Sequence, residues 1–314
     1  MCIMAESNEK AVIATVIENT AIKQRFGRLT LLFEAEAAKS FSQVKPGQFA
    51  QIRLSGVGLP RTGIISNDIA DIAHKQILLR RPFSFCDVTM DSRNKIRVMI
   101  LYCVLGPGTL RMTTLGKGDK LSIIGPLGNG FSVPVGKKYA LLVAGGMGAP
   151  PLMHLMGFLQ ANSPKMRVVV FAGAKSFEDF PFTVQVSNKN GHGVSGFTRF
   201  GIESYIATDD GSAGFRGFVT DCVRRWLRKN KPDTSEVIIY SCGPEAMLAE
   251  TAKLAGERGI DCQVSMERMM ACGIGICQSC AVECKLGDQG ETEYKLCCKD
   301  GPVFDAREVV FERR

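Results

Sequence analysis

The sequence predicts a multidomain β + α/β protein: an antiparallel β-barrel, then a doubly wound parallel sheet, then a small C-terminal domain. Three observations predict this order. Short apolar alternations broken by glycine and proline fill residues 11–135, and apolar strand segments alternate with helical ones from about residue 138. Beyond residue 261, the chain is rich in cysteine and too short for a large core. The predicted domains are 1–135, 136–261 and 262–314.

Composition narrows the class of protein. The 45% hydrophobic content is enough for packed cores, and the start, MCIMAESNEK, lacks the apolar core of a secretory signal. The apolar stretch YALLVAGGMGAPPLMHLMGFL contains adjacent prolines and a glycine cluster, which favours a strand, a turn and a helix over a membrane span. We therefore expect a cytoplasmic protein without a membrane segment, in which the 12 cysteines are reduced rather than paired.

Two further functional classes are disfavoured. The net charge of +8 is modest, and short basic clusters such as RRWLRK lack a nucleic-acid motif, so no nucleic-acid partner is expected. None of the three histidines stands beside a serine or acidic pattern typical of hydrolysis. His74, His154 and His192 are predicted to be structural or solvated.

The first segment carries two motifs that suit a flat, phosphorylated ligand. RRPFSF at residues 80–85 supplies arginine for a pyrophosphate, an aromatic ring for packing and a serine for a ring nitrogen. GPGT at residues 106–109 opens a short helix whose amides can meet a phosphate. Together they predict a flavin site, although RRPFSF alone could be an ordinary strand. Residues 59–79 are irregular and are predicted to be an excursion from the sheet.

The second segment repeats one arrangement three times, an apolar strand that ends in a glycine-containing loop. The loops are AGGMGAPPL, DDGSAG at residues 209–214 and SCGPEAM at residues 241–247. Because the carboxyl ends of parallel strands meet at one edge of a sheet, the three loops predict a crevice for a dinucleotide. The alternative is that they are only tight turns. FAGAKSFEDF leaves the choice of NAD or NADP open, since Lys175 and Ser176 suit a 2′-phosphate and Glu178 and Asp179 suit a free ribose.

The C-terminal segment contains a cysteine motif with metal-ligand spacing. Cys272, Cys277 and Cys280 have the C-x4-C-x2-C spacing of plant-type [2Fe–2S] proteins, which add one distant cysteine. Gly273 and Gly275 allow the backbone to wrap a cluster. The alternatives are a structural zinc site or free thiols, but zinc sites favour paired C-x2-C units and only one such unit is clear.

The fourth ligand must be Cys284, Cys297 or Cys298. Cys284 follows Cys280 too closely in the apparent strand CAVEC to fold back easily. Cys297 and Cys298 can return to the loop through the predicted hairpin KLGDQGETEYKL, so the choice narrows to these two.

Seven motifs follow one another along the chain: RRPFSF, GPGT, GPLGNGF, AGGMGAPPL, DDGSAG, SCGPEAM and ERMMACGIGICQSC…CKDGPVF. This series resembles that of the electron-transfer subunits of type B, NAD-dependent dihydroorotate dehydrogenases. The resemblance covers residues 11–310 and is most specific in the cysteine-rich part. It implies an FAD-binding barrel of the ferredoxin-reductase type, an NAD-binding domain and a [2Fe–2S] domain. The sequence departs from the family in GGMGAPP, where GGxGxAP is usual, and in a longer 59–79 segment.

The resemblance also implies site residues. The fourth cluster ligand becomes Cys298, with Cys297 as the fallback, beside Cys272, Cys277 and Cys280. Cys242 stands near the nicotinamide, at the catalytic position. The residues implied to bind FAD or NAD are Arg81, Pro82, Phe83, Ser84, Leu101, Tyr102, Cys103, Gly108, Thr109, Gly145, Gly146, Gly148, Asp210, Gly211, Cys242, Gly243 and Pro244.

The implied function is an electron relay in pyrimidine biosynthesis. Electrons from dihydroorotate oxidation on a separate FMN-containing catalytic subunit pass through the cluster and FAD to NAD⁺, within a heterotetramer. One alternative is the flavin and iron–sulfur subunit of a related NAD(P)H reductase of the ferredoxin–NADP reductase, sulfide dehydrogenase or hydrogenase type. Another is a zinc-stabilised binding module without a redox role.

Overall fold

The computed structural model describes residues 11–23, 25–60, 69–92, 94–187, 191–194, 201–287 and 290–311. Part of the predicted 59–79 excursion, residues 61–68, lies outside these ranges. The described remainder includes the one-turn helix α2 (Ala70–Ala73), which lies against α3 (Pro107–Met112). No helix in the described part of the chain has both the length and the apolar character needed to cross a bilayer.

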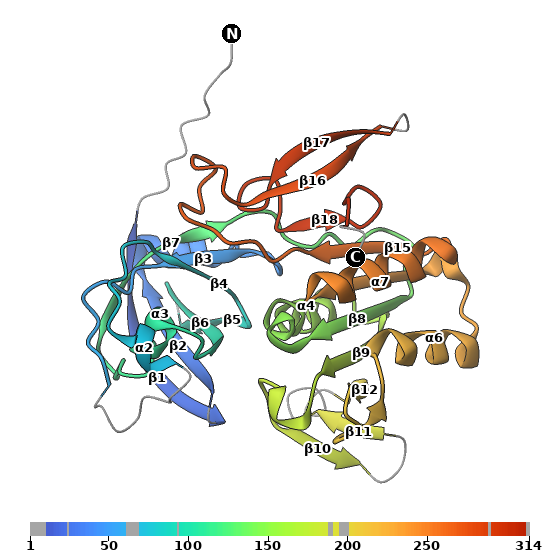
Figure 1. Cartoon of the computed structure of the whole chain (residues 1–314), viewed down its shortest axis with the longest axis horizontal. Coiled ribbons are helices and arrows are strands. Elements are labelled where there is room, and N and C mark those ends of the chain that lie inside the picture. Colours follow the sequence, from blue (N-terminus) through green and yellow to red (C-terminus); the bar gives the residue numbers. More distant parts are fainter. Residues whose placement is uncertain are drawn as a thin grey trace.

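The N-terminal part is a seven-stranded antiparallel sheet in the order β4-β3-β7-β1-β2-β6-β5 (Figure 1). Its sheet curls, since β4 also contacts β6. Alternate residues point inward, so that Leu29, Leu31 and Phe33 are fully buried. Helix α1 (Ala35–Phe41) closes this core by stacking Phe41 on Phe33. The strands are β1 (Val12–Lys23), β2 (Phe26–Glu34), β3 (Phe49–Ile52), β4 (Arg81–Ser84), β5 (Asp87–Ser92), β6 (Lys95–Cys103) and β7 (Lys120–Leu127).

The second sheet has the order β13-β12-β9-β8-β14-β15-β18, and all its pairs are parallel except β15 with β18. Its central strands are apolar on both faces, as expected for a sheet covered by helices on each side. The strands are β8 (Tyr139–Gly145), β9 (Arg167–Ala174), β12 (Glu203–Thr208), β13 (Phe215–Arg216), β14 (Val237–Cys242), β15 (Asp261–Ser265) and β18 (Val303–Asp305).

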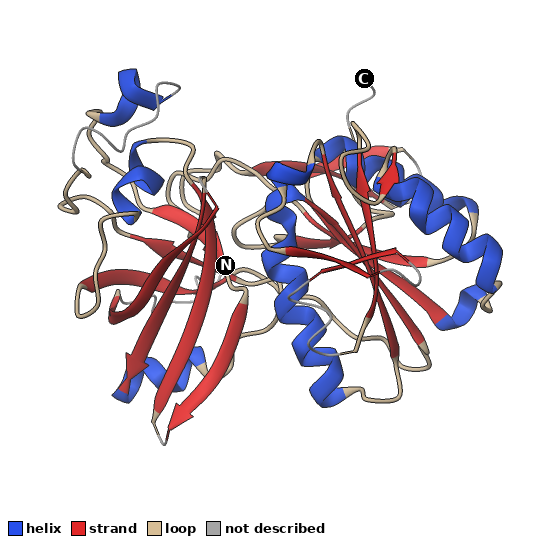
Figure 2. Cartoon of the chain, turned by 90° about the horizontal axis from the view of Figure 1, so that it is seen from below, coloured by secondary structure: helices blue, strands red, loops and turns tan. Residues whose placement is uncertain are grey.

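Helices cover both faces of this sheet (Figure 2). Helix α4 (Ala149–Asn162) packs on the face that presents Ala140 and Leu142 of β8. Helices α6 (Val219–Asn230) and α7 (Glu245–Glu257) pack on the face that presents Leu141 and Val143. The short helices η3 (Gly146–Gly148), η4 (Phe177–Asp179) and η5 (Thr234–Glu236) and two hairpins complete the described elements. The hairpins are β10 (Val184–Ser187) with β11 (Gly191–Val194), and β16 (Ala281–Leu286) with β17 (Glu291–Leu296).

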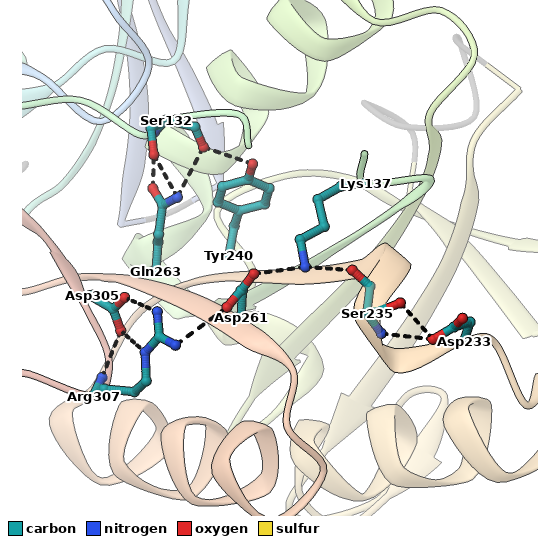
Figure 3. Close-up of polar contacts among 9 residues, drawn as sticks. All are labelled: Ser132, Lys137, Asp233, Ser235, Tyr240, Asp261, Gln263, Asp305 and Arg307. Carbon is teal, nitrogen blue, oxygen red and sulfur yellow. Dashed lines mark hydrogen bonds and ion pairs between the residues drawn. The ribbon is translucent and has the colours of Figure 1, made fainter. Parts of the chain in front are cut away.

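The connection between the sheets is tied to β14 and β15 (Figure 3). The Ser132 carbonyl accepts hydrogen bonds from Tyr240 Oη at 2.9 Å and Gln263 Nε2 at 3.0 Å. The Lys137 ammonium lies 2.7 Å from both Asp261 Oδ2 and the Ser235 carbonyl. These bonds hold the linker against the strand that leads to the cysteine-rich segment.

Candidate functional site

A cavity of about 310 Å³ lies where the first sheet, the second sheet and the cysteine-rich segment meet. The segment after β8 contributes Met147 of η3 and Pro150 of α4, and the cysteine-rich segment contributes Met266, Glu267 and Arg268. The predicted site residues that line this cavity are Pro82, Phe83, Ser84, Leu101, Tyr102, Cys103, Thr109 and Cys242. Folding thus brings the RRPFSF and GPGT motifs of the N-terminal part together with the SCGPEAM loop.

The cavity wall formed by β6 depends on a small residue in the neighbouring strand. Tyr102 is paired with Gly27 of β2, and a Cβ at Gly27 would lie 2.2 Å from the Tyr102 ring. The Tyr102 hydroxyl donates to Asn19 Oδ1 at 3.1 Å. Burial raises the pKa of Tyr102, so the ring remains neutral.

Arg81 and Gly108 lie beside this wall and do not line the cavity. A Cβ at Gly108 would meet Arg81 Cγ at 3.4 Å, so the arginine stem packs at the start of α3. Arg81 Nη1 donates to the Leu79 carbonyl at 2.9 Å. The Thr109 hydroxyl accepts from the Leu105 amide at 3.0 Å and thereby orders the loop before the helix.

The loops after β8 and β14 are in close contact because the two strands are neighbours in the sheet. A Cβ at Gly148 would lie 2.0 Å from the Cys242 carbonyl oxygen, and a Cβ at Gly243 would lie 2.9 Å from Gly145 Cα. A Cβ at Gly145 would also meet Pro244 Cδ at 2.7 Å. Because these glycines have no side chain, the two loops can approach each other closely. Gly146, with φ of +49°, faces open space in the same turn.

The DDGSAG loop follows β12, which is separated from β8 by β9, and it does not line the cavity. Asp210 Oδ1 accepts from the Ser212 hydroxyl at 2.6 Å and from its amide at 2.9 Å, and these bonds lower the pKa of Asp210. Gly211, with φ of +78°, packs on Arg216. The Asp210 amide donates to the Lys175 carbonyl, which joins this loop to the segment that follows β9.

That segment contains the residues considered for choosing between NAD and NADP. The Ser176 hydroxyl donates to Asp179 Oδ2 at 2.9 Å, and the Ser176 amide donates to the same oxygen. Glu178 forms an ion pair with Lys23 of β1 at 3.9 Å. These contacts order η4 beside the first sheet.

The loop from Cys272 to Cys280 presents backbone amides to cysteine sulfur atoms. The Ile274 and Cys277 amides lie 3.4 Å from Cys272 Sγ, and the Gly275 amide lies 3.2 Å from Cys298 Sγ. The Cys298 amide lies 3.4 Å from Cys280 Sγ. Such donors stabilise thiolates, so the loop fits an iron–sulfur cluster.

The positive φ values of Gly273 (+75°) and Gly275 (+84°) produce the tight turn of this loop. The exposed Cys277 has its sulfur 3.2 Å from Ser279 Oγ. Among the described residues, no group of three or more His, Cys, Asp or Glu side chains is arranged to hold a metal ion. A [2Fe–2S] cluster distributes its four thiolates over two irons, so it does not require such a group.

The two other candidates for the fourth ligand have different surroundings. The Cys297 thiol is fully buried and donates to the Met266 carbonyl at 3.3 Å. Cys284 is fully buried within β16, opposite Glu293 of β17. Of the three, Cys298 is the one whose sulfur receives an amide of the cysteine loop.

Sequence reasoning missed two charged residues of the cavity, Glu267 and Arg268, which lie in the methionine-rich run MERMMA. Arg268 forms two hydrogen bonds with Glu245 of α7, at 2.8 and 3.1 Å. The neighbouring Glu267 lines the same cavity, and burial raises the pKa of its carboxyl group. The available signal was a pair of opposite charges inside a methionine-rich run.

Two of the three histidines can be placed. His154 lies on α4 and is 8% exposed, and burial lowers the pKa of its imidazole from 6.5 to about 4. His74 lies on the surface. The side chain of His192 lies outside the described residues.

The chain is similar to known proteins over most of its length. The family model described as "Iron-sulfur cluster binding domain of dihydroorotate dehydrogenase B" matches residues 267–310, and "Oxidoreductase NAD-binding domain" matches residues 142–253. The solved structure of an NADH-dependent reduced ferredoxin-NADP oxidoreductase is similar in fold, with a TM-score of 0.69 and 24% identity. That match covers 96% of this chain and 91% of the other.

Several curated relatives carry one name, "Dihydroorotate dehydrogenase B (NAD(+)), electron transfer subunit". The protein from Desulforamulus reducens is 34% identical over 283 residues, which cover 90% of this chain and 93% of that relative. The protein from Caldanaerobacter subterraneus subsp. tengcongensis is 33% identical over 299 residues, which cover 95% and 98%. With this identity over almost the whole length, the chain belongs to the family of dihydroorotate dehydrogenase B electron transfer subunits.

Proposed function

We propose that this chain passes electrons from dihydroorotate oxidation, performed on a separate FMN-containing catalytic subunit, through a [2Fe–2S] cluster and FAD to NAD⁺. The pathway is pyrimidine biosynthesis, and the proposed location is the cytoplasm. The observation that carries the proposal is the cavity shared by the RRPFSF strand, the Cys242 loop and residues 266–268. The name of the curated relatives supports the same function.

In this proposal, Cys272, Cys277, Cys280 and Cys298 hold the cluster. The amides that point at three of these sulfurs stabilise negative charge on them. Cys272 and Cys298 receive amides of the loop itself, so the loop and the turn after β17 are held in one arrangement.

The cavity residues orient the two organic cofactors. Pro82, Phe83 and Ser84 would hold the flavin ring together with Leu101, Tyr102 and Cys103, which line the same cavity. Arg81, Gly108 and Thr109 would bind its phosphates. Cys242 would stand beside the nicotinamide, and the loops at Gly145, Gly148 and Asp210 would bind the rest of NAD. A bound flavin supplies the exchange between single-electron and hydride transfer.

Cys242 is assigned an orienting role. The residue is 4% exposed, and burial raises the pKa of its thiol, so the thiol stays protonated at neutral pH. A neutral thiol at this position would pack against the nicotinamide ring and help to exclude water, without acting as a base.

We also propose the division into domains 1–135, 136–261 and 262–314. Strand β15 lies at the start of the proposed third domain and β18 lies within it, and both strands extend the second sheet. The cysteine loop is therefore attached to the nucleotide sheet by strand pairing on both sides, which favours a constant distance between the cluster and the cavity.

The test is NADH formation from dihydroorotate and NAD⁺, measured with each chain alone and with both mixed. This chain alone, loaded with its cofactors, is expected to oxidise NADH with artificial acceptors and to leave dihydroorotate unchanged. Addition of the FMN-containing subunit from the same source is expected to produce dihydroorotate:NAD⁺ activity in a stable complex, which sedimentation would detect as a heterotetramer.

Two results would overturn the proposal. One is dihydroorotate turnover by this chain alone. The other is an inactive mixture in which both chains retain their cofactors, and this result would favour a related NAD(P)H reductase, whose fold the chain shares.

A further inference from the structure

Gln51 is a polar residue at the centre of an otherwise apolar strand. All four residues of β3, FAQI, are buried, and Gln51 is 0% exposed. Neither Nε2 nor Oε1 of its side chain has a hydrogen-bond partner in the described part of the chain. Buried side-chain amides in folded proteins almost always have partners, so an amide with both ends unpaired indicates a ligand that is not part of the polypeptide.

The position of Gln51 suggests which ligand this is. Its backbone is paired with Pro82 of the RRPFSF strand on one side and with Ile124 of β7 on the other. Its side chain reaches the cysteine loop, where a Cβ at Gly273 would lie 2.3 Å from Gln51 Nε2. The Gln51 side chain therefore connects β3, which is paired with the strand of the flavin motif, to the residue that follows Cys272.

The contact also explains why residue 273 has no side chain. Gly273 has φ of +75°, and any Cβ there would overlap the Gln51 amide. The loop backbone already directs two amides at Cys272 Sγ. The Gln51 side-chain amide is a third possible donor, and it contacts the same turn from β3.

We propose that the Gln51 side-chain amide donates a hydrogen bond to a sulfide of the bound [2Fe–2S] cluster, a group that is not part of the polypeptide. This inference rests on the cluster assignment in the proposed function. Reduction adds negative charge to the cluster, so a hydrogen bond to its sulfur stabilises the reduced form more than the oxidised form. Gln51 thereby raises the reduction potential of the cluster and contacts the flavin strand through its own backbone.

The experiment is a redox titration of the full-length, cluster-loaded protein, followed by electron paramagnetic resonance. Gln51→Leu keeps the approximate volume and removes the donor, and Gln51→Glu keeps the shape and replaces the donor by an acceptor. Both variants are expected to shift the cluster midpoint to a more negative potential, with the larger shift for Gln51→Glu. The matched control is Gln48→Leu, which removes a glutamine that donates to the Gly128 carbonyl at 2.7 Å, and it should leave the midpoint unchanged.

A second measurement detects the proposed hydrogen bond directly. Wild-type protein labelled with ¹⁵N only in glutamine side chains is expected to show a nitrogen hyperfine coupling to the reduced cluster in pulsed resonance spectra, and Gln51→Leu should lose this coupling. An unchanged midpoint in loaded Gln51→Leu, or a labelled wild type without the coupling, overturns the inference and leaves the proposed function standing. A wild-type protein that assembles no [2Fe–2S] spectrum overturns both.

Discussion

Cys297 and Cys298 are adjacent in the chain, yet their sulfur atoms face different parts of the protein. Cys297 Sγ points to the Met266 carbonyl, while Cys298 Sγ receives the Gly275 amide at 3.2 Å. The Cys298 amide also donates to Cys280 Sγ. At the scale of single residues, the direction of one side chain distinguishes the proposed ligand Cys298 from its neighbour Cys297.

We predict that Cys298→Ser abolishes or severely depletes the [2Fe–2S] signal in visible and electron paramagnetic resonance spectra, since it replaces a thiolate ligand by a weaker hydroxyl. Cys284→Ala and Cys297→Ala are the controls, because both thiols lie outside the loop, and both variants should retain the signal. The ligand assignment fails if Cys298→Ser keeps its cluster while either control loses it.

At the scale of elements, the turn between β8 and α4 determines how the loops at the edge of the second sheet fit together. Gly148 lies under the Cys242 carbonyl, with no space for a side chain. Gly157 lies further along α4, and the position that a Cβ would take there has no neighbouring atom within 4 Å. The two glycines therefore provide a matched pair for substitution.

Gly148→Ala is expected to displace the Cys242 loop, because backbone atoms rather than a flexible side chain oppose the new methyl group. NADH affinity, measured by titration of the cofactor-loaded protein, should fall by about tenfold or more, equivalent to about 1.4 kcal/mol or more. Gly157→Ala should leave affinity unchanged and raise stability by about 0.5–1 kcal/mol, since alanine is the better helix former. Equal NADH affinity in Gly148→Ala and the wild type would contradict the proposed role of this turn.

At the scale of the whole molecule, α4 lies between the two sheets and couples their stability. It packs on β8 and β14 of the second sheet and contacts β5 of the first. Its His154 is buried and Nδ1 has no hydrogen-bond partner among the described residues. The imidazole must therefore stay neutral in the folded protein, and burial lowers its pKa from 6.5 to about 4.

This histidine predicts acid sensitivity of the fold. Below pH 6.5 the unfolded chain binds a proton at His154 that the folded chain binds only near pH 4, so stability falls as pH falls through this window. The loss reaches about 3 kcal/mol, at about 1.36 kcal/mol for each pKa unit. Urea unfolding of His154→Leu should show a weaker decline between pH 6.5 and pH 4 than the wild type. His74→Gln, at an exposed position, should keep the wild-type decline, and an identical decline in His154→Leu would refute the prediction.

Much of this organisation could be predicted from the sequence, because it depends on residues that are close together in the chain. Apolar alternation gives the antiparallel strands, longer apolar strands alternating with helices give the parallel sheet, and the C-x4-C-x2-C spacing marks the cluster loop. Glycine-containing loops after β8, β12 and β14 follow from the same local patterns.

The tertiary structure decided what depends on contacts between distant segments. The sequence left Cys297 and Cys298 as alternatives, since a two-residue pattern does not show which side chain faces the loop. In the sequence, Gln51 looks like any other strand residue. Only the fold places Gly273, more than 200 residues later in the chain, against its side-chain amide. Two further features also depend on how the strands are ordered in the sheets. One is that Glu267 and Arg268 line the cavity, and the other is that Asp210 lies two strands from β8. Local sequence determines which elements form, but long-range packing determines which of their side chains meet.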